Sequence, residues 1–147
     1  MEYAHEARLL TAISICVTKE FISIENLQKY MDFALELQVD FVQFFEPKSA
    51  GKYKNADVKL SSSEVALLDH FFLEFNNSLK NNKYPTIIYQ GHHQRKIGCH
   101  GGGHRYLYVD SNGNIQSCPF CPNKMGSFTN GKANYAAGTC SDFQISN

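Results

Sequence analysis

The chain lacks three features that would each place it in a broad class of protein. Its 147 residues carry 14 Lys and Arg against 14 Asp and Glu, so there is no excess of positive charge to bind nucleic acid or an anionic membrane. No apolar run approaches the length of a transmembrane helix. Residues 1–8 contain charged side chains and no apolar stretch of the kind that signal peptides have. We therefore expect a cytoplasmic protein with neither nucleic acid nor a membrane as its partner.

What the chain does have is enough apolar side chain for a packed core and an uneven distribution of cysteine. Hydrophobic residues make up 43% of the sequence and aromatic residues 13%. Because secretion is not indicated, the cysteines are expected to be thiols or metal ligands rather than disulfides. Four of the five cysteines follow residue 98. Cys16 stands apart, between Ile15 and Val17, and is predicted to be a buried free thiol.

Residues 1–90 alternate between helical and strand patterns. Strands are predicted at 11–17, 41–45 and 86–89, and helices at 4–10, from Ser23 to about residue 38, and from Ser61 to Asn81. Ser23 is a predicted helix cap, and Ser61 and Glu64 have the spacing of a capping box. The core side of the last helix is predicted to carry Val65, Leu68, Phe72, Phe75 and Leu79.

This alternation predicts an α/β fold in which three parallel strands are joined by right-handed crossovers. The strand at 41–45 is almost continuously apolar, which suits a strand that is covered on both faces. Three short parallel strands with both edges open do not make a complete sheet of that kind. We therefore expect residues 1–90 to be half of a larger sheet, completed by a missing part of the protein or by a partner.

From residue 91 the composition changes to Gly, His, Cys and turn residues. A β-hairpin is predicted from strands at 105–109 and 114–117, joined by a turn that ends at Gly113. The stretch containing His92 and His93 is read as a polar loop. Residues 122–147 show little periodicity and are predicted to be loop, held in place by whatever Cys140 binds.

The hairpin would draw Cys99 towards the Cys-Pro-Phe-Cys turn that contains Cys118 and Cys121. Two thiolates from one turn can face the same point, as metal and cluster sites require, and Cys140 is the natural fourth ligand. Three alternatives stay open. A structural zinc ion could also use His100 and His104, the two turn cysteines could form a redox dithiol, or the segment could be only a thiol-rich loop.

The spacing of Cys99, Gly113 and Cys118 resembles the opening of the SPASM or twitch module, the C-terminal auxiliary-cluster region of many radical S-adenosylmethionine (radical SAM) enzymes. Residues 39–53 are similar to a late barrel strand and the loop that follows it in those enzymes. The resemblance implies that residues 1–90 are the C-terminal half of a partial (β/α) barrel. It also implies that residues 91–147 are a cysteine-rich module with one auxiliary iron–sulfur cluster, of the 4Fe-4S type.

The sequence differs from the family in the motif that starts the radical chemistry. The Cys-x3-Cys-x2-Cys loop, which binds the cluster that cleaves S-adenosylmethionine, is absent, and Lys52 stands where an Arg is usual. We therefore expect a fragment that needs an N-terminal half-barrel. S-adenosylmethionine and a peptide or small-molecule substrate would bind only to the full-length parent.

The strand patterns also predict which side chains would face the interior of such a barrel. Ile13, Ile15 and Val17 should pack on helices, so Ser14 and Cys16 would lie on the other side of the same strand. Gln43 is the polar inward candidate on the second strand, and Glu46 follows its C-terminal end, where barrel sites collect. We expect Ser14, Gln43 and Glu46 to contact the cofactor. The competing function is a zinc-stabilised interaction module without catalysis.

Overall fold

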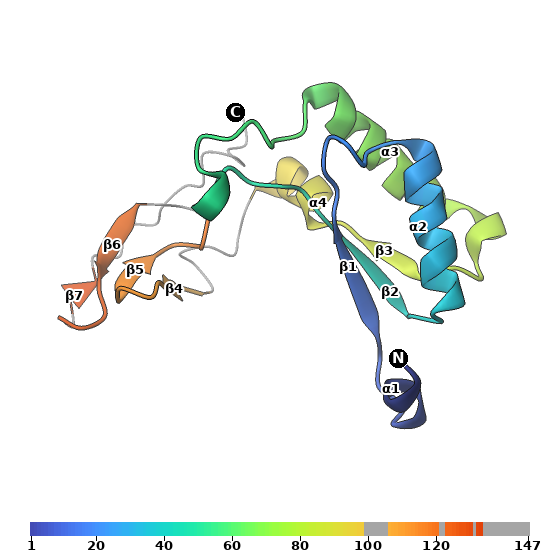
Figure 1. Ribbon diagram of the computed structural model, residues 1–147, viewed down its shortest axis with the longest axis horizontal. Helices are drawn as coiled ribbons and strands as arrows, with labels where there is room; N and C mark the ends of the chain where they lie inside the picture. Colours follow the sequence, from blue (N-terminus) through green and yellow to red (C-terminus); the bar gives the residue numbers. More distant parts are fainter. Residues whose placement is uncertain (99–105, 121–122, 131, 134–147) are drawn as a thin grey trace. The chain divides into compact units, whose positions relative to one another are not determined.

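The computed structural model describes residues 1–98, 106–120, 123–130 and 132–133. The chain divides into two units, Met1–Gly91 and His92–Asn147 (Figure 1). The first unit contains three strands and three α-helices, with two short 3-10 helices between them. In chain order these are α1 (Glu2–Glu6), β1 (Ala12–Cys16), α2 (Ile24–Glu36), β2 (Phe41–Phe45), η1 (Gly51–Tyr53), α3 (Ser62–Asn77), η2 (Leu79–Asn81) and β3 (Thr86–Ile88).

The three strands form a parallel sheet in the order β1-β2-β3, as the alternation of patterns predicted. Asp40 fixes the beginning of the sheet, because its carboxylate accepts hydrogen bonds from the backbone N–H (2.7 Å) and the hydroxyl (3.1 Å) of Thr11. Its own carbonyl accepts one from the N–H of Thr86 (3.1 Å). The bonds from Thr11 hold the pKa of Asp40 below its usual range. No barrel closes within the described residues.

Helices α2 and α3 lie on one side of this sheet and form the core with it (Figure 1). The alternation of burial along β1 is the predicted one, since Ile13 and Ile15 pack against the core while Ser14 is exposed. The prediction that β2 is covered on both faces is wrong. Gln43 is half-buried and Phe45 is exposed, because both helices pack on the face that carries Val42 and Phe44.

Both predicted helix caps are confirmed. The Ser23 hydroxyl accepts the backbone N–H of Asn26 (3.1 Å), and the Ser61 hydroxyl accepts that of Glu64 (3.3 Å). The Glu64 carboxylate in turn accepts the N–H of Ser61 (2.6 Å), which completes the capping box.

The predicted core side of α3 is wrong at its C-terminal end. Leu68, Phe72 and Phe75 are buried, but Leu79 is 85% exposed. The helix ends at Asn77 and Ser78 adopts an extended backbone, so the helical period does not continue as far as Leu79. Phe71 is buried instead, and its ring stacks between Phe44 and Phe75.

The residues after β3 differ from the predicted polar loop. Helix α4 (Gln90–Ile97) contains His92 and His93, and His92 is buried. Gln, Arg and Lys are good helix formers, but the segment has almost no apolar side chains, so its periodicity gave no indication of a helix. No helix in the described part of the chain is both long and apolar enough to cross a membrane.

The second unit contains an antiparallel sheet in the order β4-β5-β6-β7. Its strands are β4 (Tyr108–Val109), β5 (Asn114–Gln116), β6 (Lys124–Ser127) and β7 (Lys132–Ala133). The first two form the predicted hairpin, although β4 is shorter than expected. The last two lie in a stretch that was predicted to be loop, which is wrong for these residues. Both strands are short and contain no β-branched residue, so no strand pattern is visible there.

Candidate metal centre

The hairpin that precedes the cysteine turn is held by the side chain of Asp110. One carboxylate oxygen accepts the backbone N–H groups of Asn112 (2.8 Å) and Asn114 (2.9 Å), and the other accepts the side-chain amide of Asn114 (2.7 Å). These bonds, with the Asn114 side chain first, hold the pKa of Asp110 below its usual range. Gly113 completes the turn with a φ of +76°, a conformation that favours glycine. Local hydrogen bonds to the Asp110 side chain, rather than apolar contacts, therefore stabilise the turn of this hairpin.

Cys118 lies two residues after β5, at the end of the hairpin opposite the turn. Its thiol is partly buried and forms no disulfide. The backbone N–H of Phe120 donates a hydrogen bond to Cys118 Sγ at 3.3 Å. An N–H that points at sulfur two residues earlier stabilises negative charge on that sulfur, and such bonds tune iron–sulfur clusters. The Cys-Pro-Phe-Cys segment thus begins as a turn in which the first sulfur already has a backbone donor.

Cys118 is the single member of the predicted ligand set that the structure places. Cys99, Cys121 and Cys140 lie outside the described residues, as do the alternative zinc ligands His100 and His104. Within the described ranges, no three His, Cys, Asp or Glu side chains come together in a way that could hold a metal ion. The predicted convergence of sulfur atoms therefore stays a prediction.

Two of the three predicted cofactor-contacting residues are neighbours in the first unit. Ser14 on β1 stands opposite Gln43 on β2 in the parallel register, and Gln43 stands opposite Ile88 on β3. All three positions lie on the face of the sheet that α2 and α3 leave open. On this face β1 carries the small side chains of Ala12, Ser14 and Cys16, and β3 carries Thr86 and Ile88.

Glu46, the third predicted residue, is bonded to a residue that the sequence did not indicate. The hydroxyl of Tyr89 donates to a carboxylate oxygen of Glu46 at 2.5 Å. The Tyr89 ring is 1% exposed and packs against Phe44 and Phe72. Glu46 follows β2 and Tyr89 follows β3, so the carboxyl ends of two neighbouring parallel strands bring them together. That topological rule was the only indication available in the sequence, and it applies to any polar residue at this edge.

Cys16 is not the buried thiol that its apolar neighbours suggested. It is exposed, because it lies at the C-terminal end of β1 on the open face of the sheet. Partial burial against the sheet still raises the pKa of its thiol above the ordinary value. A thiol with a raised pKa is mostly protonated at neutral pH and is a poor ligand or nucleophile. Cys16 is therefore separate from the candidate metal centre in chemistry as well as in sequence.

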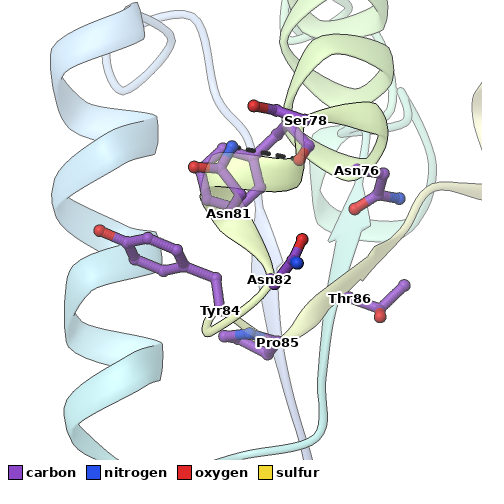
Figure 2. A pocket seen from close by; sticks show the side chains of 8 residues that line it. Asn76, Ser78, Asn81, Asn82, Tyr84, Pro85 and Thr86 are labelled. Atoms are coloured by element: carbon purple, nitrogen blue, oxygen red, sulfur yellow. Dashed lines mark hydrogen bonds between the residues drawn. The ribbon is translucent and has the colours of Figure 1, made fainter.

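A small polar pocket of about 110 Å³ lies at the other end of β3 (Figure 2). Residues from the end of α3 to the start of β3 line it, and the polar ones include Asn76, Asn81, Asn82 and Thr86. Two of these side-chain amides already form hydrogen bonds with the backbone. Asn81 donates to the carbonyl of Phe75 (3.1 Å), and Asn76 bonds both backbone groups of Ile87. These amides hold the connection between α3 and β3.

The chain matches no protein-family model, no curated protein and no solved structure. The Cys118 turn offers a sulfur ligand with a backbone donor, and the open sheet face offers Ser14 and Gln43 beside each other. Cys118 is one sulfur and not by itself a complete metal site, while Ser14 and Gln43 can form hydrogen bonds through a hydroxyl and an amide.

Proposed function

We propose that the second unit binds one auxiliary iron–sulfur cluster, of the 4Fe-4S type, through Cys99, Cys118, Cys121 and Cys140. The chain would then serve as the C-terminal part of a radical SAM/SPASM-type protein. The observation that carries the proposal is the hydrogen bond from the Phe120 N–H to Cys118 Sγ, because backbone bonds of this kind are typical of cysteine sulfurs that hold iron–sulfur clusters. A thiol must lose its proton to become a ligand, so a donor aimed at the sulfur favours binding.

The described part of the second unit buries few apolar side chains, which also supports the proposal. Ile115 is the one buried hydrophobic residue among the described residues of that unit. Large side chains such as Phe120 and Phe128 are more than half exposed there. Small units without a sufficient core are commonly stabilised by a bound metal or by disulfides. In the cytoplasmic setting that we propose, thiols stay reduced, so a bound cluster is more suitable than disulfides.

The first unit supports the barrel half of the proposal through its open face. Its sheet has helices on one side, whereas parallel sheets are usually covered on both. In the full-length parent, an N-terminal half-barrel or another partner would complete the sheet, and Ser14, Gln43 and Glu46 would contact S-adenosylmethionine. Without the three-cysteine loop the chain alone would not cleave S-adenosylmethionine. Reductive cleavage by the purified chain would contradict this part of the proposal.

A zinc-stabilised interaction module is the competing function, because the same sulfur donors suit zinc. Anaerobic reconstitution with iron and sulfide separates the two. An iron–sulfur protein absorbs in a thiolate-to-iron band at about 400 nm, whereas a zinc protein is colourless and contains stoichiometric zinc. We expect the absorption band.

Alanine variants then assign the ligands one at a time. Cys118→Ala and Cys121→Ala should each abolish the absorption band, because a cluster with three sulfur ligands is much less stable. Cys16→Ala is the matched control, since it also removes one thiol, and it should leave the band unchanged. Equal loss of the band in all three variants would contradict the separation of Cys16 from the metal centre.

A further inference from the structure

The two edges of the parallel sheet differ in how their outward-pointing backbone groups are hydrogen-bonded. At the β3 edge, the side chain of Asn76 bonds both backbone groups of Ile87. Its oxygen accepts the Ile87 N–H (3.0 Å) and its amide donates to the Ile87 carbonyl (2.9 Å). The backbone N–H of Thr86 points the other way, to the carbonyl of Asp40 that precedes β2. Asn76 therefore occupies the position of a neighbouring strand and closes this edge.

The β1 edge has no comparable closure. The N–H of Val17 donates to Phe45 and the carbonyl of Thr11 accepts from Asp40 and Phe41, so odd-numbered residues direct their backbone groups towards β2. The backbone groups of Ala12, Ser14 and Cys16 consequently point to the outer edge. Within the described residues no strand pairs with β1 on that side, and one side chain reaches it, the Tyr30 hydroxyl on the carbonyl of Ser14 (3.2 Å).

The composition of β1 leaves the edge open to another strand. Proteins commonly protect edge strands with a lysine, a proline or a bulge, and the sequence Ala-Ile-Ser-Ile-Cys contains no charge and no proline. Its register with β2 runs without a break. On the helix-covered side, Ile13 and Ile15 are only partly buried, and the Tyr30 ring that reaches this edge packs against Phe33, which is 48% exposed. An added strand would cover these side chains.

We propose that the β1 edge is a dimer interface, in which β1 pairs antiparallel with β1 of a second copy of this chain. In the symmetric register Ser14 stands opposite Ser14 of the other copy, and Ala12 stands opposite Cys16. No charged residue lies on β1, so pairing the two strands brings no like charges together between them, and the chain has no net charge to oppose association. The side chains on the axis are small, and the Ser14 carbonyl, which accepts the Tyr30 hydroxyl, has a second lone pair for the Ser14 N–H of the other copy. The result is a continuous sheet with the helices of both copies on one face.

A second copy suits this edge better than an unrelated strand because the interface is self-complementary. Each copy offers the same alternating N–H and C=O groups, which is the requirement for a closed two-fold contact. Asn76 then limits the assembly to two copies, since the far β3 edge of each sheet is already closed. The half-barrel partner of the proposed function would occupy the same edge, so the two proposals concern different states of the chain.

Cross-linking tests the register directly. In a Cys16→Ser background, Ser14→Cys places two thiols opposite each other, with Cα atoms about 5.5 Å apart in a hydrogen-bonded antiparallel pair, a separation that a disulfide spans. Mild oxidation should convert most of this variant into a covalent dimer on a non-reducing gel. Gln43→Cys in the same background is the matched control, because it lies on the same open face but on the central strand.

Sedimentation of the unmodified chain provides the second measurement. We expect a dimer, and we expect Ser14→Lys and Ser14→Pro to raise its dissociation constant at least tenfold while the circular dichroism stays unchanged. Proline is tolerable because the Ser14 N–H takes no part in the β1–β2 ladder. A monomeric wild-type chain, or equal cross-linking of Gln43→Cys and Ser14→Cys, would overturn the dimer proposal. Neither result bears on the absorption band that tests the cluster.

Discussion

Different kinds of interaction stabilise the two units of this chain internally. In Met1–Gly91, side chains from α2, α3 and all three strands form one buried core, in which Leu27, Met31 and Leu68 have no exposed surface. In the described part of the second unit, a single apolar residue is buried and the hairpin depends on hydrogen bonds to Asp110. Burial of one large apolar side chain contributes about 1.5–3 kcal/mol, so the first unit has a source of stability that the second has little of.

Because of this difference, we propose that the second unit depends on a ligand to fold. The first unit should keep its structure whatever happens at the cysteines, because its core contains none of them. The second unit should gain most of its order when an inorganic centre binds, since metal binding and folding are coupled in units of this kind. Variants that damage one unit and spare the other can therefore test the comparison.

The largest effect is expected in the core of the first unit. Leu68→Ala should lower the free energy of unfolding of that unit by about 2–5 kcal/mol, because it leaves a cavity against the sheet. The helical circular dichroism signal in a denaturant titration measures this change. Leu79→Ala is the matched control on the exposed end of the same segment, and it should change the free energy by less than about 0.5 kcal/mol. Equal losses would contradict the placement of the core.

The second effect is expected in the hairpin. Gly113→Ala should destabilise the second unit by about 1–2 kcal/mol, because alanine is strained at positive φ. Its Cβ would also lie 3.3 Å from the Thr129 side chain. Backbone amide resonances of residues 106–120 report this change, while those of β1 to β3 should stay in place. Gly113→Asn is the control, since asparagine tolerates this conformation better, and it should cost less than alanine.

A smaller effect is expected at the carboxyl edge of the sheet. Tyr89→Phe removes the hydroxyl that bonds Glu46 and should lower the free energy of unfolding of the first unit by about 1 kcal/mol, because water can reach Glu46 and replace part of the bond. Thermal unfolding measures the loss. Tyr84→Phe removes another tyrosine hydroxyl, which bonds Asp32 at the surface, and should cost less. A larger loss for Tyr84→Phe than for Tyr89→Phe would contradict the expectation that the Tyr89–Glu46 bond contributes more stability than the Tyr84–Asp32 bond.

The smallest effect is expected when the hairpin that Asp110 stabilises is exposed to acidic pH. The Asn114 side chain and two backbone N–H groups lower the folded-state pKa of Asp110 below its unfolded value. The hairpin stabilisation is therefore complete above the unfolded pKa and is lost as the pH falls through the folded pKa. Chemical shifts of the Gly113 and Asn114 amides between neutral and acidic pH should follow this transition. In Asp110→Asn the same amides should show a much weaker pH dependence, and an unchanged transition would contradict the assignment.

Much of the first unit was predictable from the sequence because local and long-range preferences agree there. The capping residues Ser23 and Ser61, the apolar run at Phe41–Phe45 and the alternation in β1 each indicate the structure that forms. Leu79 was misplaced because a helical period says nothing of where the helix ends. Cys16 was misplaced because the neighbouring residues do not reveal that one face of the sheet lacks a cover.

The second unit was less predictable because little apolar periodicity is present there. The turn at Asp110–Gly113 was recognisable from its residue types, and the hairpin followed from it. Strands β6 and β7 and helix α4 were missed, since none has an apolar pattern of its own. Of the predicted ligands the structure places Cys118, and the link from Tyr89 to Glu46 depends on tertiary contacts that no local pattern records.

We propose that an inorganic centre bound by the cysteines orders the second unit. Amide hydrogen exchange of the full chain, measured without metal and after anaerobic reconstitution with iron and sulfide, tests it most directly. We expect the protection of residues 106–130 to rise strongly on reconstitution while the protection of β1, β2 and β3 stays the same. Equal protection of residues 106–130 in the two states would contradict it.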